Sequence, residues 1–228
     1  ISAPALTTIY GTGSNTGLNI SNNNSSLNSI SLPVLNTVEG VITISGNQGI
    51  GSVNLPSLAT ISDLIINSNP SLSTISISAT SIKNLTISNN NNLNSISFSQ
   101  LTTGSSLSIV SNPILTTIVF PLCTNLTGNI SVTSNSLVAS ISFPSLINLG
   151  GYISFNGDIA LTSISFPQLT TVGDYIVISN SSSQAISFPQ LTTITNYLSI
   201  AGGISSLNFS KLACIQNISI GGGGTITM

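Results

Sequence analysis

A repeat of about 22 residues runs through this chain of 228 residues and constrains its fold more than any other feature. The segment SISFPQLTTVGDYIVISN from Ser163 returns as AISFPQLTTITNYLSIAG from Ala185, and ISFPSLINLGGYISFNG from Ile141 is a looser copy. A period of this length is typical of solenoids, whose units bury an apolar face only by stacking on one another. Large apolar residues mark the place of the Phe in SISFP, at Leu32, Leu55, Ile77, Phe98, Phe120, Phe143, Phe166, Phe188 and Phe209.

Each unit contains two short stretches in which apolar and small polar residues alternate. One has the pattern L-x-I, as at 107–109, and the other reads SISF, as at 163–166. Alternation with a period of two predicts strands that point Leu, Ile and Phe inward and hydroxyls outward. The segment L-T-T-I/V between them, as at 169–172, predicts an irregular third side. We therefore predict one all-β solenoid over residues 1–228, with about nine or ten coils, almost no helix and a glycine-rich terminal segment at 221–228.

Charge is scarce, with two Lys, four acids, no His and 3% charged residues in all. Without a basic surface the chain lacks the means to neutralise phosphates, so we expect no nucleic-acid partner. Most acid–base, triad and zinc chemistries need His, so we predict a protein that is not an enzyme and holds no cofactor or metal. No stretch approaches the ~18 consecutive apolar residues of a spanning helix, so no transmembrane segment is expected.

A few residue types could still carry chemistry. Asp158 and Asp174 are expected to be solvated turn residues, and an acid pair at the ~5–9.5 Å separation of glycosidases is the alternative. Cys123 and Cys214 lie about four coils apart, or roughly 19 Å in a regular stack. We therefore expect two buried, unpaired cysteines.

An asparagine follows the L-x-I strand in six consecutive units. Asparagine side chains commonly satisfy the backbone groups of turns. We predict that these residues form a structural ladder along one corner of the solenoid, and a ligand-binding role is the alternative. The six are Asn69, Asn89, Asn112, Asn135, Asn156 and Asn180.

The outward positions of the SISF strands are small hydroxyl residues in unit after unit. They predict a flat face along the rod. Such side chains have little conformational entropy to lose on contact, so the face suits packing against another flat surface: a sister rod, a polysaccharide or ice. The predicted interaction face comprises Ser29, Ser31, Ser52, Ser95, Ser97, Ser140, Ser142, Ser163, Ser165 and Ser187.

The residues also carry a family resemblance. The stretch FPQLTTVGDYIVISN from Phe166 and the stretch SLATISDLIINSNPSLSTIS from Ser57 resemble the receptor L-domain branch of the leucine-rich-repeat-like proteins, which includes Ser-rich fungal cell-wall proteins and repeat adhesins. The resemblance covers about residues 4–220. It implies a right-handed β-helix that binds partners or builds surfaces. The near absence of charge departs from the hormone receptors of that branch, so their function is not carried over.

Together these patterns predict a non-enzymatic structural or adhesive protein, located outside the cell or on its surface. Low charge removes the repulsion that keeps proteins apart, so we expect self-association into a fibre or layer. Neither end of the sequence shows a polar capping unit, which favours addition of further rods at open strand edges. The alternative is a module that binds glycan or ice through the flat hydroxyl face, and the excess of Ser over Thr there disfavours ice.

Overall fold

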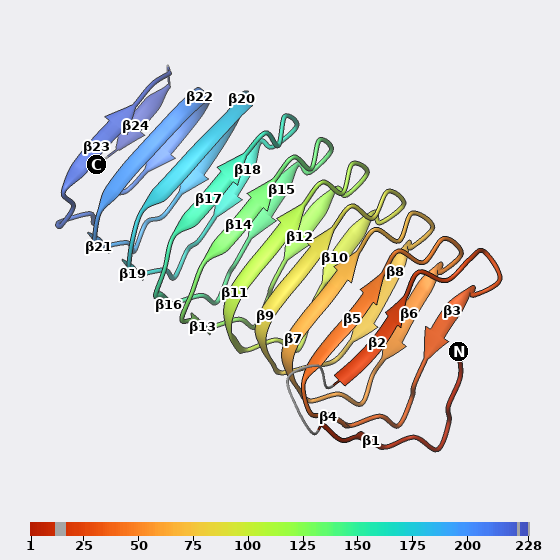
Figure 1. Ribbon diagram of the computed structural model, residues 1–228. Helices are drawn as coiled ribbons and strands as arrows, with labels where there is room; N and C mark the ends of the chain where they lie inside the picture. Colours follow the sequence, from red (N-terminus) through yellow and green to blue (C-terminus); the bar gives the residue numbers. More distant parts are fainter. Residues whose placement is uncertain (12–16, 223, 228) are drawn as a thin grey trace.

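The computed structural model describes residues 1–11, 17–222 and 224–227. These residues wind into a β-solenoid of about nine coils, and every strand pairing is parallel and joins neighbouring coils (Figure 1). The described residues contain no helix, and hence none that could cross a membrane. The predicted all-β solenoid with a repeat of about 22 residues is confirmed.

The strands with the L-x-I pattern form one side of the rod, which we call the L-x-I face. They pair in a continuous parallel series, with the inward Leu and Ile in register from coil to coil. They are β2 (Gly17–Ser21), β5 (Val41–Ser45), β7 (Thr60–Asn67), β9 (Ser81–Ser88), β11 (Thr103–Val110), β14 (Ile130–Thr133), β17 (Ile153–Asn156), β20 (Ile176–Ser187), β22 (Tyr197–Asn208) and β23 (Asn217–Ile220).

The strands with the SISF pattern form a second side, which we call the SISF face. The long strands β20 and β22 turn the corner and supply this side in their coils through residues 185–187 and 206–208. The other members are β3 (Ser29–Ser31), β6 (Ser52–Leu55), β8 (Thr74–Ile77), β10 (Ser95–Ser97), β12 (Thr117–Val119), β15 (Ser140–Ser142), β18 (Ser163–Ser165) and β24 (Thr225–Thr227).

The third side, predicted to be irregular, consists of short parallel strands. In the middle coils its place is taken by the first residues of β7, β9 and β11, which run straight on into the L-x-I face. Elsewhere it consists of the two-residue strands β1 (Thr8–Ile9), β4 (Thr37–Val38), β13 (Asn125–Leu126), β16 (Asn148–Leu149), β19 (Thr171–Val172) and β21 (Thr193–Ile194).

Columns of apolar side chains fill the interior. All nine marker positions of the repeat are buried. From Phe98 to Phe209 the rings stack from coil to coil, with centroids 4.9–5.8 Å apart and planes within 12°. This spacing matches the ~4.8 Å between neighbouring strands, so one aromatic ring per coil gives a continuous stack.

The end of the chain extends the stack, and one cysteine differs from expectation. In the glycine-rich segment predicted at 221–228, residues 225–227 form β24, which pairs with residues 206–208 of β22, while Gly223 and Met228 lie outside the described residues. Both cysteines are free, but only Cys123 is buried. Cys214 is exposed because it lies on the last described coil, beside Thr193 of the coil before it. Burial raises the pKa of the Cys123 thiol to about 12, which keeps it protonated and unreactive.

Candidate functional site

The SISF face is a regular array of small polar side chains. Register pairing places Ser140 beside Ser163, and Ser142 beside Ser165, and the same columns extend through the coils on either side. All ten predicted face residues lie on these strands, and each is exposed or half-buried. No Asp, Glu, Lys or Arg occurs in any strand segment of this face. The strand segments of this face are therefore uncharged, with hydroxyls that can both donate and accept hydrogen bonds.

A buried ladder of side chains runs through the corner that leads from the L-x-I face to the SISF face. Asn112 shows the pattern: its Nδ2 donates to the carbonyls of Ile87 and Val110, both at 3.1 Å. The same Nδ2 contacts Asn135 Oδ1 of the next coil at 3.2 Å, while Asn112 Oδ1 accepts from the backbone N of Asn90 at 3.1 Å. Each rung thus satisfies backbone groups and links two coils. The buried rungs are Asn47, Asn69, Asn90, Asn112, Asn135, Asp158 and Asn180.

Four of the six predicted ladder residues are rungs, and two are not. Asn69, Asn112, Asn135 and Asn180 are buried in the ladder. The predictions for Asn89 and Asn156 are wrong, because the buried rungs of their coils lie one and two positions later, at Asn90 and Asp158. Asn89 is exposed and has a φ of +56°, the left-handed conformation that the residue before a rung adopts at Ser68, Ser111 and Ser134 as well. Asn156 ends β17 and is exposed, two positions before the rung Asp158.

A spacing in the sequence accompanies most of the rungs. A buried aliphatic residue lies three positions after each rung from Asn47 to Asp158, as Leu93 does after Asn90 and Leu161 after Asp158. From Asn69 to Asp158 the backbone N of this residue donates to the carbonyl of the rung, at 3.2 Å for Leu93 and 3.0 Å for Leu161. At Asn69, Asn90 and Asn112 the pattern N-x-x-L is a tight turn whose first side chain enters the ladder. Asn24 has the same pattern with Leu27 but is exposed.

Asp158 contradicts the expectation of a solvated turn residue, because it is fully buried. Its Oδ1 accepts hydrogen bonds from the backbone N and the Nδ2 of Asn135, at 2.8 and 3.2 Å. Its backbone N donates to Asn180 Oδ1 at 2.9 Å. Its Oδ2 is buried with no hydrogen-bond partner. Burial raises the pKa of Asp158 to about 6, against the opposing effect of the bonds from Asn135.

Asp174 lies at a different corner, before β20 begins, and is half-buried. Its Oδ1 accepts a 2.7 Å hydrogen bond from Asn196 of the next coil. Asp158 and Asn180 are neighbouring rungs of the ladder. Asp174 lies six residues before Asn180 along mostly extended chain, which separates the two acids by roughly 20 Å. That exceeds the carboxyl separation of glycosidases, so the predicted alternative of a paired acid site is wrong for these two residues.

Three stacked tyrosines lie at the corner where Asp174 sits, and the sequence reasoning missed them. Tyr152 and Tyr175 have ring centroids 4.7 Å apart, and Tyr175 and Tyr197 have centroids 4.9 Å apart. Burial chiefly, and then the neighbouring tyrosines and Asp174, raise the pKa of Tyr175. The tyrosines recur at the spacing of the repeat, which was the signal available.

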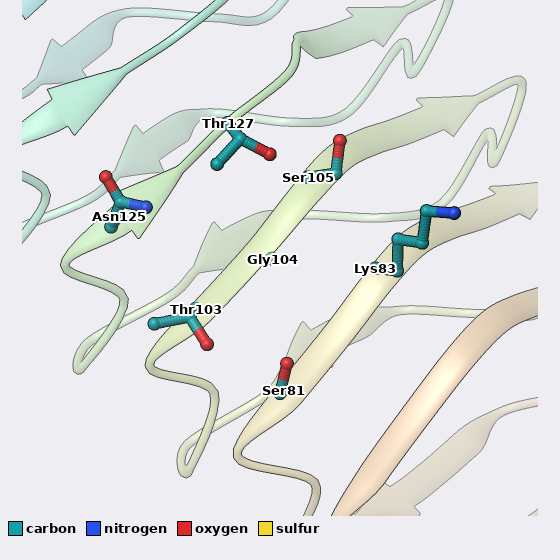
Figure 2. A pocket seen from close by; sticks show the side chains of 7 residues that line it. All are labelled: Ser81, Lys83, Thr103, Gly104, Ser105, Asn125 and Thr127. Carbon is teal, nitrogen blue, oxygen red and sulfur yellow. The ribbon is translucent and has the colours of Figure 1, made fainter.

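A shallow groove of about 320 Å³ opens between β9, β11 and the following coil (Figure 2). It forms at a step in the stack, because the corner from Gly104 to Leu107 is one residue shorter than the paired corner from Leu126 to Ile130. Lys83 is exposed at its edge, and the other side chains that line the groove belong to Ser, Thr and Asn residues. The lining residues are Ser81, Lys83, Thr103, Gly104, Ser105, Asn125 and Thr127.

Across the described residues, no group of three or more His, Cys, Asp or Glu side chains is placed to hold a metal ion. Comparison of the chain with protein-family models, with curated proteins and with solved structures gave no match in any of the three. The resemblance to receptor L domains therefore stays a prediction, carried by the residues quoted above.

Proposed function

We propose that this protein is a non-enzymatic, extracellular structural protein whose rods pack side by side with copies of themselves through the SISF face. The observation that carries the proposal is the absence of charged residues from every strand segment of that face. Soluble proteins normally stay apart through charged surfaces, and their removal favours association.

The geometry of the SISF face supports the same proposal. Its outward columns are in register along the rod, as in Ser140, Ser163 and Ala185. Serine has one short rotor and little entropy to lose, and its hydroxyl both donates and accepts hydrogen bonds. The face can therefore pair with an identical face related by a two-fold axis, which is the commonest symmetry of protein association. Cell-wall proteins and adhesins of the resembled branch suggest the extracellular location.

Charge placed on the SISF face tests this proposal. Ser142 and Ser165 lie side by side on the SISF face, so the S142K/S165K variant places two positive charges there. Ser131 and Ser154 are a matched pair on the L-x-I face, and S131K/S154K is the control. In sedimentation velocity experiments we expect the unmodified protein to form larger species as its concentration rises. The S142K/S165K variant should stay monomeric, and the S131K/S154K variant should behave like the unmodified protein. Equal behaviour of the two variants would overturn the choice of face.

The groove favours a second candidate function, the binding of an acidic polysaccharide. Lys83 offers an ammonium group for a carboxylate, and Ser105, Asn125 and Thr127 offer groups that match sugar hydroxyls. We expect calorimetry to detect binding of an oligouronate, and a Lys83→Gln variant to bind about tenfold more weakly, the effect of ~1.4 kcal/mol. Lys211→Gln is the control, since Lys211 contacts Gln190 on another corner.

Ice binding is the remaining alternative for the SISF face. A measurement of thermal hysteresis in solutions of the unmodified protein tests it.

A further inference from the structure

Asp158 is the one acidic rung in a buried ladder that is otherwise built from amides. In the rungs Asn69, Asn90, Asn112 and Asn135, the Nδ2 group donates to two backbone carbonyls and to the Oδ1 of the next rung. Asp158 keeps the accepting half of this pattern through Oδ1. In place of the donating Nδ2 it has Oδ2, which has no hydrogen-bond partner.

The repeat identifies what surrounds Oδ2. Asn135 Nδ2 donates to the carbonyls of Ile109 and Thr133, both at 3.1 Å. In the register of the sheet, Ile109 pairs with Val132, and Thr133 pairs with Asn156. The corresponding acceptors for Asp158 are therefore the carbonyls of Val132 and Asn156. An ionised carboxylate would turn a negative oxygen toward these acceptors, whereas a protonated one would supply the missing donor.

No charged group offsets an ionised Asp158. The elements packed on either side of the rung, residues 130–142 and 176–187, contain no Asp, Glu, Lys, Arg, His, Tyr or Cys. The nearest corner groups with titratable side chains, Tyr152, Asp174 and Tyr175, lie at the other end of β17 and β20. Two further buried polar atoms near this joint, Asn180 Nδ2 and Gln184 Oε1, also lack partners. The hydrogen-bond deficit is thus concentrated at one coil junction.

We propose that Asp158 is a proton-binding rung: it is held as the neutral acid with its proton on Oδ2, and loss of this proton as the pH rises weakens the joint between the coils of Asn135 and Asn180. Burial of a charge without a partner is costly, and the neutral acid avoids that cost while completing the ladder. This inference does not depend on self-association, because it concerns the folded rod itself.

The direction of the pH effect follows from the raised pKa of Asp158, about 6 against an ordinary value of 3.8. The folded chain binds this proton more tightly than the unfolded chain does. The added stability is therefore complete below about pH 3.8 and is lost as the pH rises through about 6. The corresponding change in the folding equilibrium constant is about a hundredfold.

Carboxyl ¹³C NMR tests the protonation directly, because the chain has only three aspartates, Asp63, Asp158 and Asp174. With ¹³C-labelled aspartate, we expect one signal to titrate near pH 6 and to disappear in the Asp158→Asn variant. If that variant does not fold, D63N and D174N assign the remaining signal by elimination. An Asp158 signal that titrates below pH 4 would overturn the proposal.

Denaturant unfolding between pH 4 and 8 tests the consequence. The Asp158→Asn variant restores the amide rung. We expect it to lose the change of about a hundredfold in the folding equilibrium constant that the unmodified chain shows over this pH range. Asp174→Asn is the matched control, since it also removes an acid from a hydrogen-bonded corner, and it should keep the original pH dependence. The same pH profile for D158N and the unmodified protein would contradict the proposed role.

Discussion

The Phe143→Ala variant is expected to lose about 3–5 kcal/mol of unfolding free energy, the cost of removing a large aromatic side chain from a tightly packed core. Phe143 is fully buried, and its ring stacks on Phe120 at 5.0 Å and on Phe166 at 5.1 Å. Alanine would leave a cavity in the middle of the stack and remove both ring contacts. Because each coil rests on its neighbours, the loss destabilises the coils on both sides.

Phe143→Leu is the matched control. Leucine occupies the same column at Leu32 and Leu55, where it is buried in the native rod. Leucine keeps part of the apolar volume in the column, so this substitution should cost clearly less than Phe143→Ala. Chemical denaturation followed by circular dichroism measures both variants. A Phe143→Ala variant within 1 kcal/mol of the unmodified protein, on the same scale of cavity costs, would show that the phenylalanine stack is not a main source of stability.

Asn112→Ala should be comparably destabilising, by about 3–5 kcal/mol, because about four hydrogen bonds of ~1 kcal/mol each depend on this side chain. Its Nδ2 serves the carbonyls of Ile87 and Val110 and reaches Asn135. Its Oδ1 accepts from both the backbone N and the Nδ2 of Asn90. Alanine leaves these buried groups unsatisfied, with no water at hand in a fully buried corner.

Asn94→Ala is the control for this prediction, since Asn94 lies nearby but is exposed. It should change stability by no more than about 0.5 kcal/mol. Asn112→Asp provides a second comparison, because it places in another coil the acid that occurs naturally at position 158. It should be more stable at pH 4 than at pH 8. Equal unfolding midpoints for N112A and N94A would contradict the structural role of the ladder.

The sequence repeat was sufficient to predict the solenoid, the buried marker columns and the outward SISF columns. These features depend only on alternation and on a constant period, so each coil predicts its neighbours. The ladder was harder to place. Four asparagines stand in a row from Asn89 to Asn92, and residue type alone does not say which one turns inward. The backbone decides, because the left-handed residue Asn89 directs Asn90 into the corner.

Asp158 was misplaced for a different reason. An acid in an N-G-D turn normally faces solvent, because carboxylates are seldom fully buried. Residue type therefore favoured an exposed Asp158, although its place in the repeat indicated the ladder. Aligned on the buried leucine three positions later, Asp158 falls in the asparagine column. The groove at Lys83 could not be predicted either, because it arises where a corner changes length between two neighbouring coils. Such steps depend on how two neighbouring coils pair, and the sequence of a single unit does not predict this pairing.

The rod has two sets of polar groups, one inside a corner and one on an outer face. Inside the corner, amides and one acid complete the hydrogen bonds of the turns and join the coils. Outside, hydroxyls form a face that lacks charge. The interior ladder satisfies buried backbone groups and links the coils, and we propose that the outer face determines the tendency of the rods to associate. Substitutions should therefore separate the two properties, with Asn112 affecting unfolding and Ser142 and Ser165 affecting association.

The most direct test of the central claim is small-angle X-ray scattering over a concentration series of the unmodified protein. Side-by-side packing of rods through the SISF face increases the cross-sectional radius of gyration, whereas end-to-end addition increases only the length. We expect the cross-section to grow with concentration, and the S142K/S165K variant to abolish that growth. A cross-section that stays constant while the protein remains monomeric, or while only its length increases, would contradict the proposed association face.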